Sequence, residues 1–254
     1  ASAVGMAIAN RNFAARTGLD KTGLVNHKIF VISGDGCMME GCTGEAASLA
    51  GTLALDELVV FYDDNSISIE GSTDLAFGED VAARFAAYNW RVIKVDNAND
   101  IAKCDAALAQ AVESDGRPTL IIGKTRIGFG APNKEGKASA HGEPLGAEEV
   151  EALRKHLNMP AEPFTVPQEV KEFCHARAEE LEAQAADWEK RFEAFLEADS
   201  ERAKLIYSFL NRTVPENIQD ELLKVIDVSK PVATRATSGA VLQKAAELVP
   251  ALFG

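Results

Sequence analysis

The stretch that decides the fold is KIFVISGDG, residues 28–36. Its first six residues are mostly apolar and partly β-branched, which is typical of a strand buried in a parallel sheet. Gly34-Asp35-Gly36 then ends the strand. Outward from this stretch, similar runs predict strands at 57–63, 90–96 and 118–125, and intervening segments predict helices at 2–16, 45–55, 79–87 and 100–114. This alternation predicts an α/β fold in which helices flank a parallel sheet.

The remainder of the chain does not continue the alternation. Residues 126–146 hold five glycines and two prolines, which predicts a long irregular loop of the kind that is usually functional or disordered. An apolar stripe from Val170 to Phe195 predicts a long amphipathic helix with a charged outer face. A break follows at 213–215, and a last helix is expected to run to Leu248. Because the chain starts with Ala1 inside a helical pattern and ends in an apolar segment, we expect it to be a piece of a longer protein.

Composition narrows the class of function. There are 26 Lys and Arg against 39 Asp and Glu, for a net charge of −13, whereas nucleic-acid binders need a basic surface. No run approaches the ~20 apolar residues that span a bilayer, and no signal peptide is recognisable at the start. The four cysteines form no CxxC pair, which fits a reducing, cytoplasmic location. We therefore expect no nucleic-acid partner and no membrane association.

Polar residues end two of the predicted strands. Asp35 follows the strand at 28–33, and Asn65 follows the strand at 57–63, thirty positions later. Ligands of open parallel sheets bind beyond the carboxyl ends of the strands, so these side chains can meet if the strands are neighbours. Carboxylate and amide oxygens suit Mg²⁺, which commonly completes its shell with phosphate oxygens and water. The flanking glycines let the backbone approach a phosphate closely. Asp63 and Asp64 are not assigned to the metal.

Several longer motifs support this hypothesis. The spacing of Gly-Asp-Gly and Asn resembles the thiamine-diphosphate signature, and the surrounding motifs resemble transketolase along essentially the whole chain: GDGCMMEG (34–41), AGTL (50–53), FYDDNSISI (61–69), KTRIGFGAPNK (124–134) and HGEPLG (141–146). The resemblance implies a thiamine-diphosphate-binding domain over 1–203 that lacks its N-terminal part. It also implies a linker over 204–213 and the truncated start of a pyrimidine-binding α/β domain over 214–254.

The resemblance also implies thiamine diphosphate and Mg²⁺ as cofactors, with Ca²⁺ or another divalent ion able to substitute. Asp35, the side chain of Asn65 and the main-chain carbonyl of Ile67 match the family's metal ligands. The backbone of Gly36 matches a contact to the cofactor's diphosphate. Ile69 falls where an apolar residue approaches the thiazolium ring.

Three further residues match functional positions of the family. His141 matches a catalytic histidine that contacts both the diphosphate and the substrate near the reacting centre. Arg235 matches an arginine that holds the phosphate end of the sugar, a task that suits its fork of donors. Glu40 matches an acid at the subunit interface, so the intact enzyme is expected to be a homodimer. Without the family, His141 would be a surface histidine and Arg235 a solvated charge near a helix start.

The implied reaction is that of transketolase in the pentose phosphate pathway: reversible transfer of a two-carbon ketol group from a ketose phosphate to an aldose phosphate. One alternative is another thiamine-diphosphate enzyme, such as dihydroxyacetone synthase or deoxyxylulose-phosphate synthase. A second is a non-catalytic binding or assembly subunit. No GxGxxG opens a helix after a strand, which disfavours a Rossmann dehydrogenase.

One departure from the family pattern concerns substrate preference. Ala138 stands where many transketolases carry a second loop histidine. The resemblance therefore does not indicate which sugars this protein prefers as substrates. Other parts of the family's active site lie outside this sequence, so the chain alone is expected to be inactive.

Overall fold

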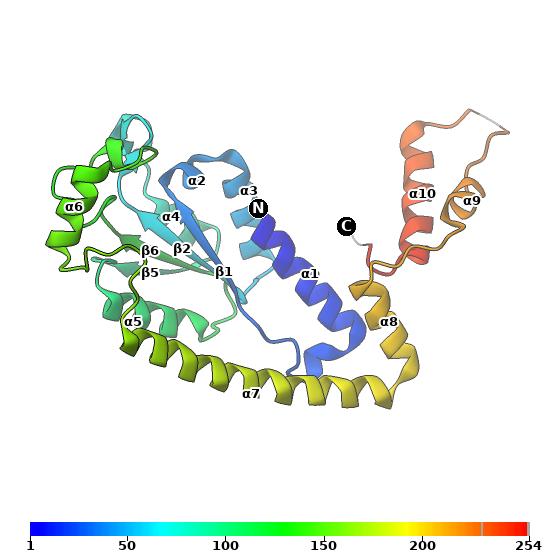
Figure 1. Cartoon of the computed structure of the whole chain (residues 1–254). Helices are drawn as coiled ribbons and strands as arrows, with labels where there is room; N and C mark the ends of the chain where they lie inside the picture. The colour runs from blue at the N-terminus through cyan, green and yellow to red at the C-terminus, as the bar shows by residue number, and fades with distance from the viewer. Residues whose placement is uncertain (230, 253–254) are drawn as a thin grey trace. The chain divides into compact units, whose positions relative to one another are not determined.

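A four-stranded parallel sheet carries the functional part of the chain. The structure is a computed structural model that describes residues 1–229 and 231–252. Its main strands are Ile29–Gly34 (β1), Leu58–Asp64 (β2), Arg91–Val95 (β5) and Thr119–Lys124 (β6), in the order β1-β2-β6-β5 (Figure 1). The α/β fold predicted from the sequence is therefore confirmed. Because β1 and β2 are neighbours, with Gly34 opposite Asp63, the residues that follow them meet at one edge of the sheet.

Helices cover the two faces of this sheet. One face packs against Ser2–Thr17 (α1), Asp35–Met39 (α2), Gly41–Thr52 (α3) and Val81–Ala87 (α4), and the other packs against Ile101–Val112 (α5). On the first face Phe85 meets the Trp90 ring edge-on at 5.1 Å between centroids. The Trp90 indole N–H donates to the Ala47 carbonyl at 2.8 Å. The main core thus ties α3 and α4 to the start of β5.

The side chains on one face of strand β1 are less buried than the sequence predicts. The sequence predicts a buried strand at 28–33, and Ile29 and Val31 do pack against the core. On the opposite face, however, Phe30 is 55% exposed and Ile32 is 84% exposed. The physical reason is the lack of cover, because the cluster under α5 joins Val59, Val95 and Ile121 of the other three strands and, among the described residues, contains none of β1. A continuous apolar run cannot reveal whether both faces of its strand are covered.

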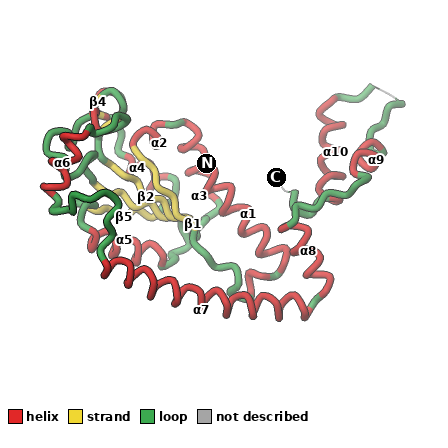
Figure 2. Tube along the Cα trace, in the orientation of Figure 1, coloured by secondary structure: helices red, strands yellow, loops and turns green. Residues whose placement is uncertain are grey.

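The first compact unit comprises residues 1–10 and 26–171. Besides the main sheet it holds a short hairpin of Ile67–Ser68 (β3) and Gly71–Ser72 (β4), and helix Ala147–His156 (α6). Residues 126–146 form the predicted irregular loop, which is interrupted only by the short 3₁₀ turn Ala138–Ala140 (η3). Figure 2 shows loops gathered with β4 and α6 at the end of the sheet where the carboxyl ends of its strands lie.

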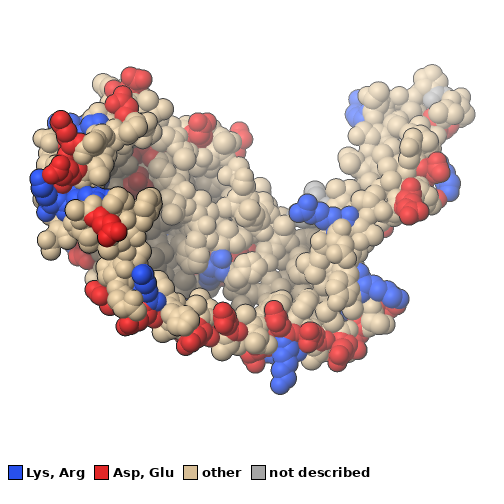
Figure 3. Space-filling view, viewed as in Figure 1, with Lys and Arg blue, Asp and Glu red and all other residues tan. Residues whose placement is uncertain are grey.

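The second unit comprises residues 11–25 and 172–254. Its helices are most of Gln168–Ala198 (α7), then Ser200–Leu210 (α8), Ile218–Leu223 (α9) and Thr234–Leu248 (α10). A small core joins Leu19, Leu24 and Ile206. The long helix is confirmed, although none of its residues is buried, and Figure 3 shows charged side chains along α7. Residues 204–210 of the predicted linker are helical, and the proposed domain boundaries stay a prediction.

No helix in the described ranges is both long and apolar enough to cross a lipid bilayer.

Candidate functional site

Asp35 is a deeply buried carboxylate at the end of the sheet. It begins α2 directly after β1, and only 3% of its surface is exposed. Its Oδ1 accepts a hydrogen bond from the Tyr62 hydroxyl at 2.5 Å, and its Oδ2 accepts one from the Asn65 backbone N–H at 3.3 Å. Both donors come from β2 or the residue after it. The pairing of β1 with β2 therefore determines the surroundings of this carboxylate.

Burial raises the pKa of the Asp35 carboxyl above its ordinary value. The hydrogen bond from Tyr62 partly opposes this rise, and the nearby Asp64 carboxylate adds to it. Burial also raises the pKa of Tyr62, and the bond to Asp35 adds to that rise. The phenol therefore stays protonated and acts as the donor in this pair. A buried carboxylate of this kind is well suited to a positive ligand.

Asn65 follows β2 in a tight local turn. Its Nδ2 donates to Asp63 Oδ2 at 3.3 Å, and its Oδ1 accepts from the Ile67 N–H at 3.0 Å. Asp63 in turn accepts a hydrogen bond from the Thr125 hydroxyl, which follows β6. Ser66, between Asn65 and Ile67, has φ of 63°. That left-handed conformation is uncommon for a residue other than glycine and is often found at functional sites.

A cavity of about 990 Å³ opens beside these residues. It brings together all but one of the residues singled out from the sequence: Asp35, Gly36, Glu40, Asn65, Ile67, Ile69 and His141. Arg235 is not among the lining residues; it lies in α10, in the second unit. The cavity therefore joins the ends of β1 and β2, the β3–β4 hairpin and the irregular loop. The functional role of each residue stays a prediction.

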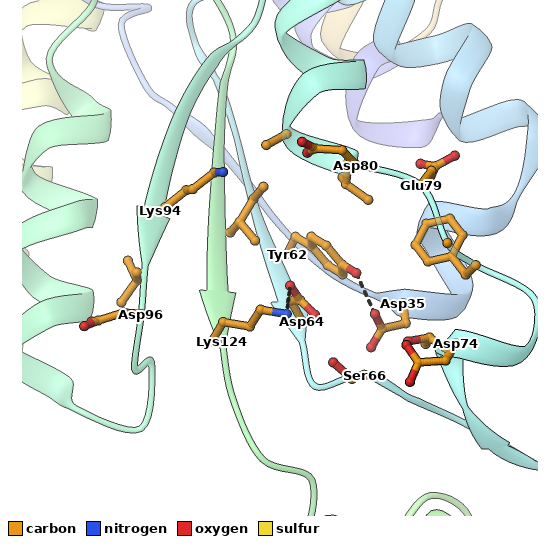
Figure 4. Close-up of a pocket in the computed structure, with 17 residues that line it drawn as sticks. Asp35, Tyr62, Asp64, Ser66, Asp74, Glu79, Asp80, Lys94, Asp96 and Lys124 are labelled. Carbon is orange, nitrogen blue, oxygen red and sulfur yellow. Dashed lines mark hydrogen bonds and ion pairs between the residues drawn. The ribbon is translucent and has the colours of Figure 1, made fainter.

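A second cavity, of about 640 Å³, is also lined by Asp35. Figure 4 shows the Tyr62 hydroxyl pointing to Asp35 and Lys124 reaching Asp64, with which it pairs at 2.7 Å. Six carboxylates and two lysines line this cavity: Asp35, Asp64, Asp74, Glu79, Asp80, Asp96, Lys94 and Lys124. The adjacent Asp63 and Asp64 therefore have different partners, as the alternation of side chains along a strand requires.

The loop that carries His141 is fixed by two acidic side chains. Glu135 accepts from the Gly130 N–H at 2.9 Å and pairs with Arg126 at 2.9 Å. Glu149, on α6, accepts from both the backbone and the side-chain nitrogen of Asn133 at 2.8 Å. These bonds lower the pKa of Glu149, so the carboxylate stays ionised and keeps its two donors. The predicted irregular loop is thus held in one shape at the cavity.

The residues present fit a divalent cation and a diphosphate. Asp35 is a buried carboxylate with neutral hydrogen-bond donors, and an added cation would offset the burial that raises its pKa. Beside it, a Cβ on Gly34 or Gly36 would meet no atom of the described residues within 4 Å, apart from those of its chain neighbours and, for Gly36, of its own helix backbone. The described residues contain no group of three His, Cys, Asp or Glu side chains placed to hold a metal. A cation here would thus need amide, main-chain, phosphate or water oxygens as well, which is usual for Mg²⁺.

Sequence reasoning did not identify the residues that hold Asp35 and Asn65 in place. Tyr62, Asp63 and Thr125 act through hydrogen bonds, and two of these three residues lie far along the chain from their partners. The available signal was the pattern of β2 itself, because Tyr62 and Asp63 lie near the end of that strand, three and two residues before Asn65. That signal becomes specific only when the neighbouring strands are known.

Comparison with known proteins agrees with this geometry. The family model described as transketolase, thiamine diphosphate binding domain, matches residues 1–215. A plasmid-encoded transketolase of Cupriavidus necator is 44% identical over all of this chain, and that of Geobacillus stearothermophilus is 42% identical. Among solved structures, transketolase from Leishmania mexicana is similar with a TM-score of 0.88 at 34% identity, covering 98% of this chain and 37% of that one. The chain spans 38% of the length of both curated relatives.

Proposed function

This chain belongs to the transketolase family, and we propose that it forms the part of a transketolase active site that holds the diphosphate of thiamine diphosphate through a divalent cation. The observation that carries the proposal is the shared cavity of Asp35, Asn65 and Ile67 with Gly36 and His141. These residues come from separate strand ends and loops, yet they line one space. That space is large enough for a cofactor, since small-molecule sites measure roughly 300–1,000 Å³.

Each residue has a distinct proposed task. Asp35, the Asn65 amide oxygen and the Ile67 carbonyl hold the cation, and the backbone of Gly36 contacts the diphosphate. Ile69 supplies an apolar surface near the thiazolium. His141 exchanges a proton with, or donates a hydrogen bond to, a hydroxyl of the sugar, as histidine can near neutral pH. When bound, the cofactor supplies the nucleophile and the electron sink for breaking and forming the C–C bond.

The proposed reaction is reversible transfer of a two-carbon ketol group between sugar phosphates. Structures of the related Pichia stipitis transketolase were solved in complex with xylulose-5-phosphate and with sedoheptulose-7-phosphate. We extend this to the present protein with Arg235 as the residue that binds the sugar's phosphate. Glu40 is proposed to lie at a homodimer interface, and the intact enzyme is proposed to be cytoplasmic.

Calorimetric titration of the chain with thiamine diphosphate tests the proposal. In excess Mg²⁺ we expect weak binding, with a dissociation constant above about 1 μM, because these residues form only one side of the proposed cofactor site. Binding should vanish without the metal and in Asp35→Ala and Asn65→Ala. Asp105→Ala removes an exposed carboxylate on α5 and should bind as the unaltered chain does.

Two results would contradict parts of this proposal. Binding that is absent, or that is unaffected in Asp35→Ala, would remove the proposed cofactor site. Detectable ketol transfer by the 254-residue chain alone would instead show that no further segments are needed for turnover.

A further inference from the structure

Near its end, strand β2 carries two side chains that each contact one of the two proposed side-chain ligands of the cation. Tyr62 and Asp63 are consecutive, so their side chains point to opposite faces of the sheet. Tyr62 is 2% exposed and donates to Asp35 Oδ1 at 2.5 Å, as Figure 4 shows. Asp63 accepts from Asn65 Nδ2 at 3.3 Å. One strand end therefore reaches both ligands, from its two sides.

The hydrogen bond from Tyr62 restricts the rotation of the Asp35 carboxylate. An ionised carboxylate offers about four acceptor positions on its two oxygens. Tyr62 occupies one position on Oδ1, and the Asn65 N–H occupies one on Oδ2. The remaining positions are left for a cation. Because the Tyr62 ring is held in the core beneath the sheet end, its hydroxyl is a rigid reference point for this carboxylate.

The contacts of Asn65 determine which end of its amide faces the ligand. A carboxylate accepts only, so Asp63 requires the NH₂ group, and a backbone N–H donates only, so Ile67 requires the oxygen. Both partners specify the same orientation of the amide. A cation can bind the oxygen and not the NH₂ group. The Thr125 hydroxyl donates to the other oxygen of Asp63 and ties it to β6.

We propose that Tyr62 and Asp63 are positioning residues for the cation: Tyr62 fixes the carboxylate of Asp35, and Asp63, held by Thr125, fixes the amide of Asn65. This inference rests on the proposed function, because it takes Asp35 and Asn65 as ligands. Neither positioning residue itself contacts the cation. Partners of metal ligands typically change metal affinity by about 10- to 100-fold when they are altered.

The test uses Mn²⁺ as the probe in the presence of thiamine diphosphate, with free Mn²⁺ measured by electron paramagnetic resonance. Tyr62→Phe removes the hydroxyl and keeps the ring, and Asp63→Asn keeps the shape while permitting either amide orientation at Asn65. We expect both variants to bind Mn²⁺ about 10- to 100-fold more weakly. Thr125→Val should weaken binding in the same direction and supplies a third variant.

Two matched controls separate positioning from general effects. Tyr88→Phe makes the same substitution on another tyrosine of the first unit, whose ring meets Phe85 at 6.0 Å, and it should leave affinity unchanged. Asp64→Asn removes the same charge from the next residue of β2, which pairs with Lys124. If Asp64→Asn weakens Mn²⁺ binding as much as Asp63→Asn does, local charge is responsible and the inference for Asp63 is overturned.

Cation preference gives a second measurement that a merely damaged structure would not change. Mg²⁺ needs near-ideal octahedral ligand geometry, whereas Ca²⁺ accepts flexible arrangements. Loss of positioning should therefore weaken Mg²⁺ more than Ca²⁺ in competition with Mn²⁺, and shift the preference towards Ca²⁺. An equal loss for both ions would show a general structural defect and overturn the inference.

The failures of the two proposals are distinguishable. If the unaltered chain binds Mn²⁺ in an Asp35-dependent manner while Tyr62→Phe and Asp63→Asn bind equally well, the positioning inference fails and the cofactor site stands. If Asp35→Ala binds as the unaltered chain does, the cofactor site fails and the inference fails with it.

Discussion

Asp35 illustrates at the scale of one residue how a proposed binding site conflicts with stability. Its carboxyl is buried, and burial raises its pKa, with a further rise from Asp64 and an opposing effect from Tyr62. Ionisation of this group at neutral pH therefore opposes folding when no cation is present. The unfavourable effect is fully present above the raised pKa and disappears below the unfolded value of about 3.9.

Asp35→Asn should thus raise the melting temperature of the cation-free chain at pH 7–8. The gain should shrink as the pH falls towards 4, because the native carboxyl then becomes protonated and neutral. Added Mg²⁺ and thiamine diphosphate should raise the melting temperature of the unaltered chain but not that of the variant. Circular dichroism melts across this pH range measure both effects. A variant that is less stable at pH 7–8 would contradict the argument.

The meeting of Asp35 and Asn65 at one end of the sheet could be predicted from the sequence, but their side-chain hydrogen-bond partners could not. Asp35 and Asn65 stand out because each ends a strand-like run and because their motifs are local in the sequence. Tyr62 and Thr125 reach their partners over 27 and 62 positions of the chain. Such pairs depend on which strands are neighbours and in what register, and a residue pattern along one segment does not contain that information.

At the scale of elements, α3 lies unusually close to the turn before β5. A Cβ added to Gly51 would stand 1.6 Å from the Tyr88 carbonyl oxygen and 3.4 Å from the Trp90 ring. The closest contact is with backbone, which cannot rotate away as the end of a flexible side chain can. Glycine is therefore required at this position for packing, although alanine is intrinsically the better helix former.

Gly51→Ala should destabilise the chain by about 1–3 kcal/mol or more, the usual range for overpacking. Gly44→Ala is the matched control on the same helix, where the nearest atom is the Tyr88 hydroxyl at 3.4 Å. It should be neutral or stabilising by up to ~1 kcal/mol, from helix propensity. Urea denaturation measures both. A Gly51→Ala variant within ~0.5 kcal/mol of the unaltered chain would show that α3 can move away.

The burial of the strands could be predicted from the sequence for β6 but not fully for β1, and the difference has a physical reason. The prediction at 118–125 corresponds to β6, whose residues from Thr119 to Gly123 are all buried, because it lies between two other strands and has both faces covered. The run at 28–33 is also largely apolar, yet its strand has one face uncovered, with Phe30 and Ile32 exposed. Composition reports what a strand can bury, and only the tertiary structure decides what it does bury.

At the scale of the whole molecule, the chain spans 38% of the length of its curated relatives. We expect the protein from its natural source to have an intact mass well above the 27.2 kDa of this chain, because the proposed reaction needs parts of the site that these residues do not supply. Intact-mass spectrometry decides the matter. A mass near 27.2 kDa would favour a binding or assembly subunit that works with a separate chain.

The exposed face of β1 has a consequence for solubility. Phe30 and Ile32 stand open on an edge strand, and such edges tend to pair with strands of other molecules and to nucleate aggregates. The net charge of −13 counters this tendency, since like-charged molecules repel each other. Added salt shortens the range of that repulsion from about 30 Å at 0.01 M to about 10 Å at 0.1 M. A solution of this chain is therefore expected to stay clear at low ionic strength and to become turbid as salt is added.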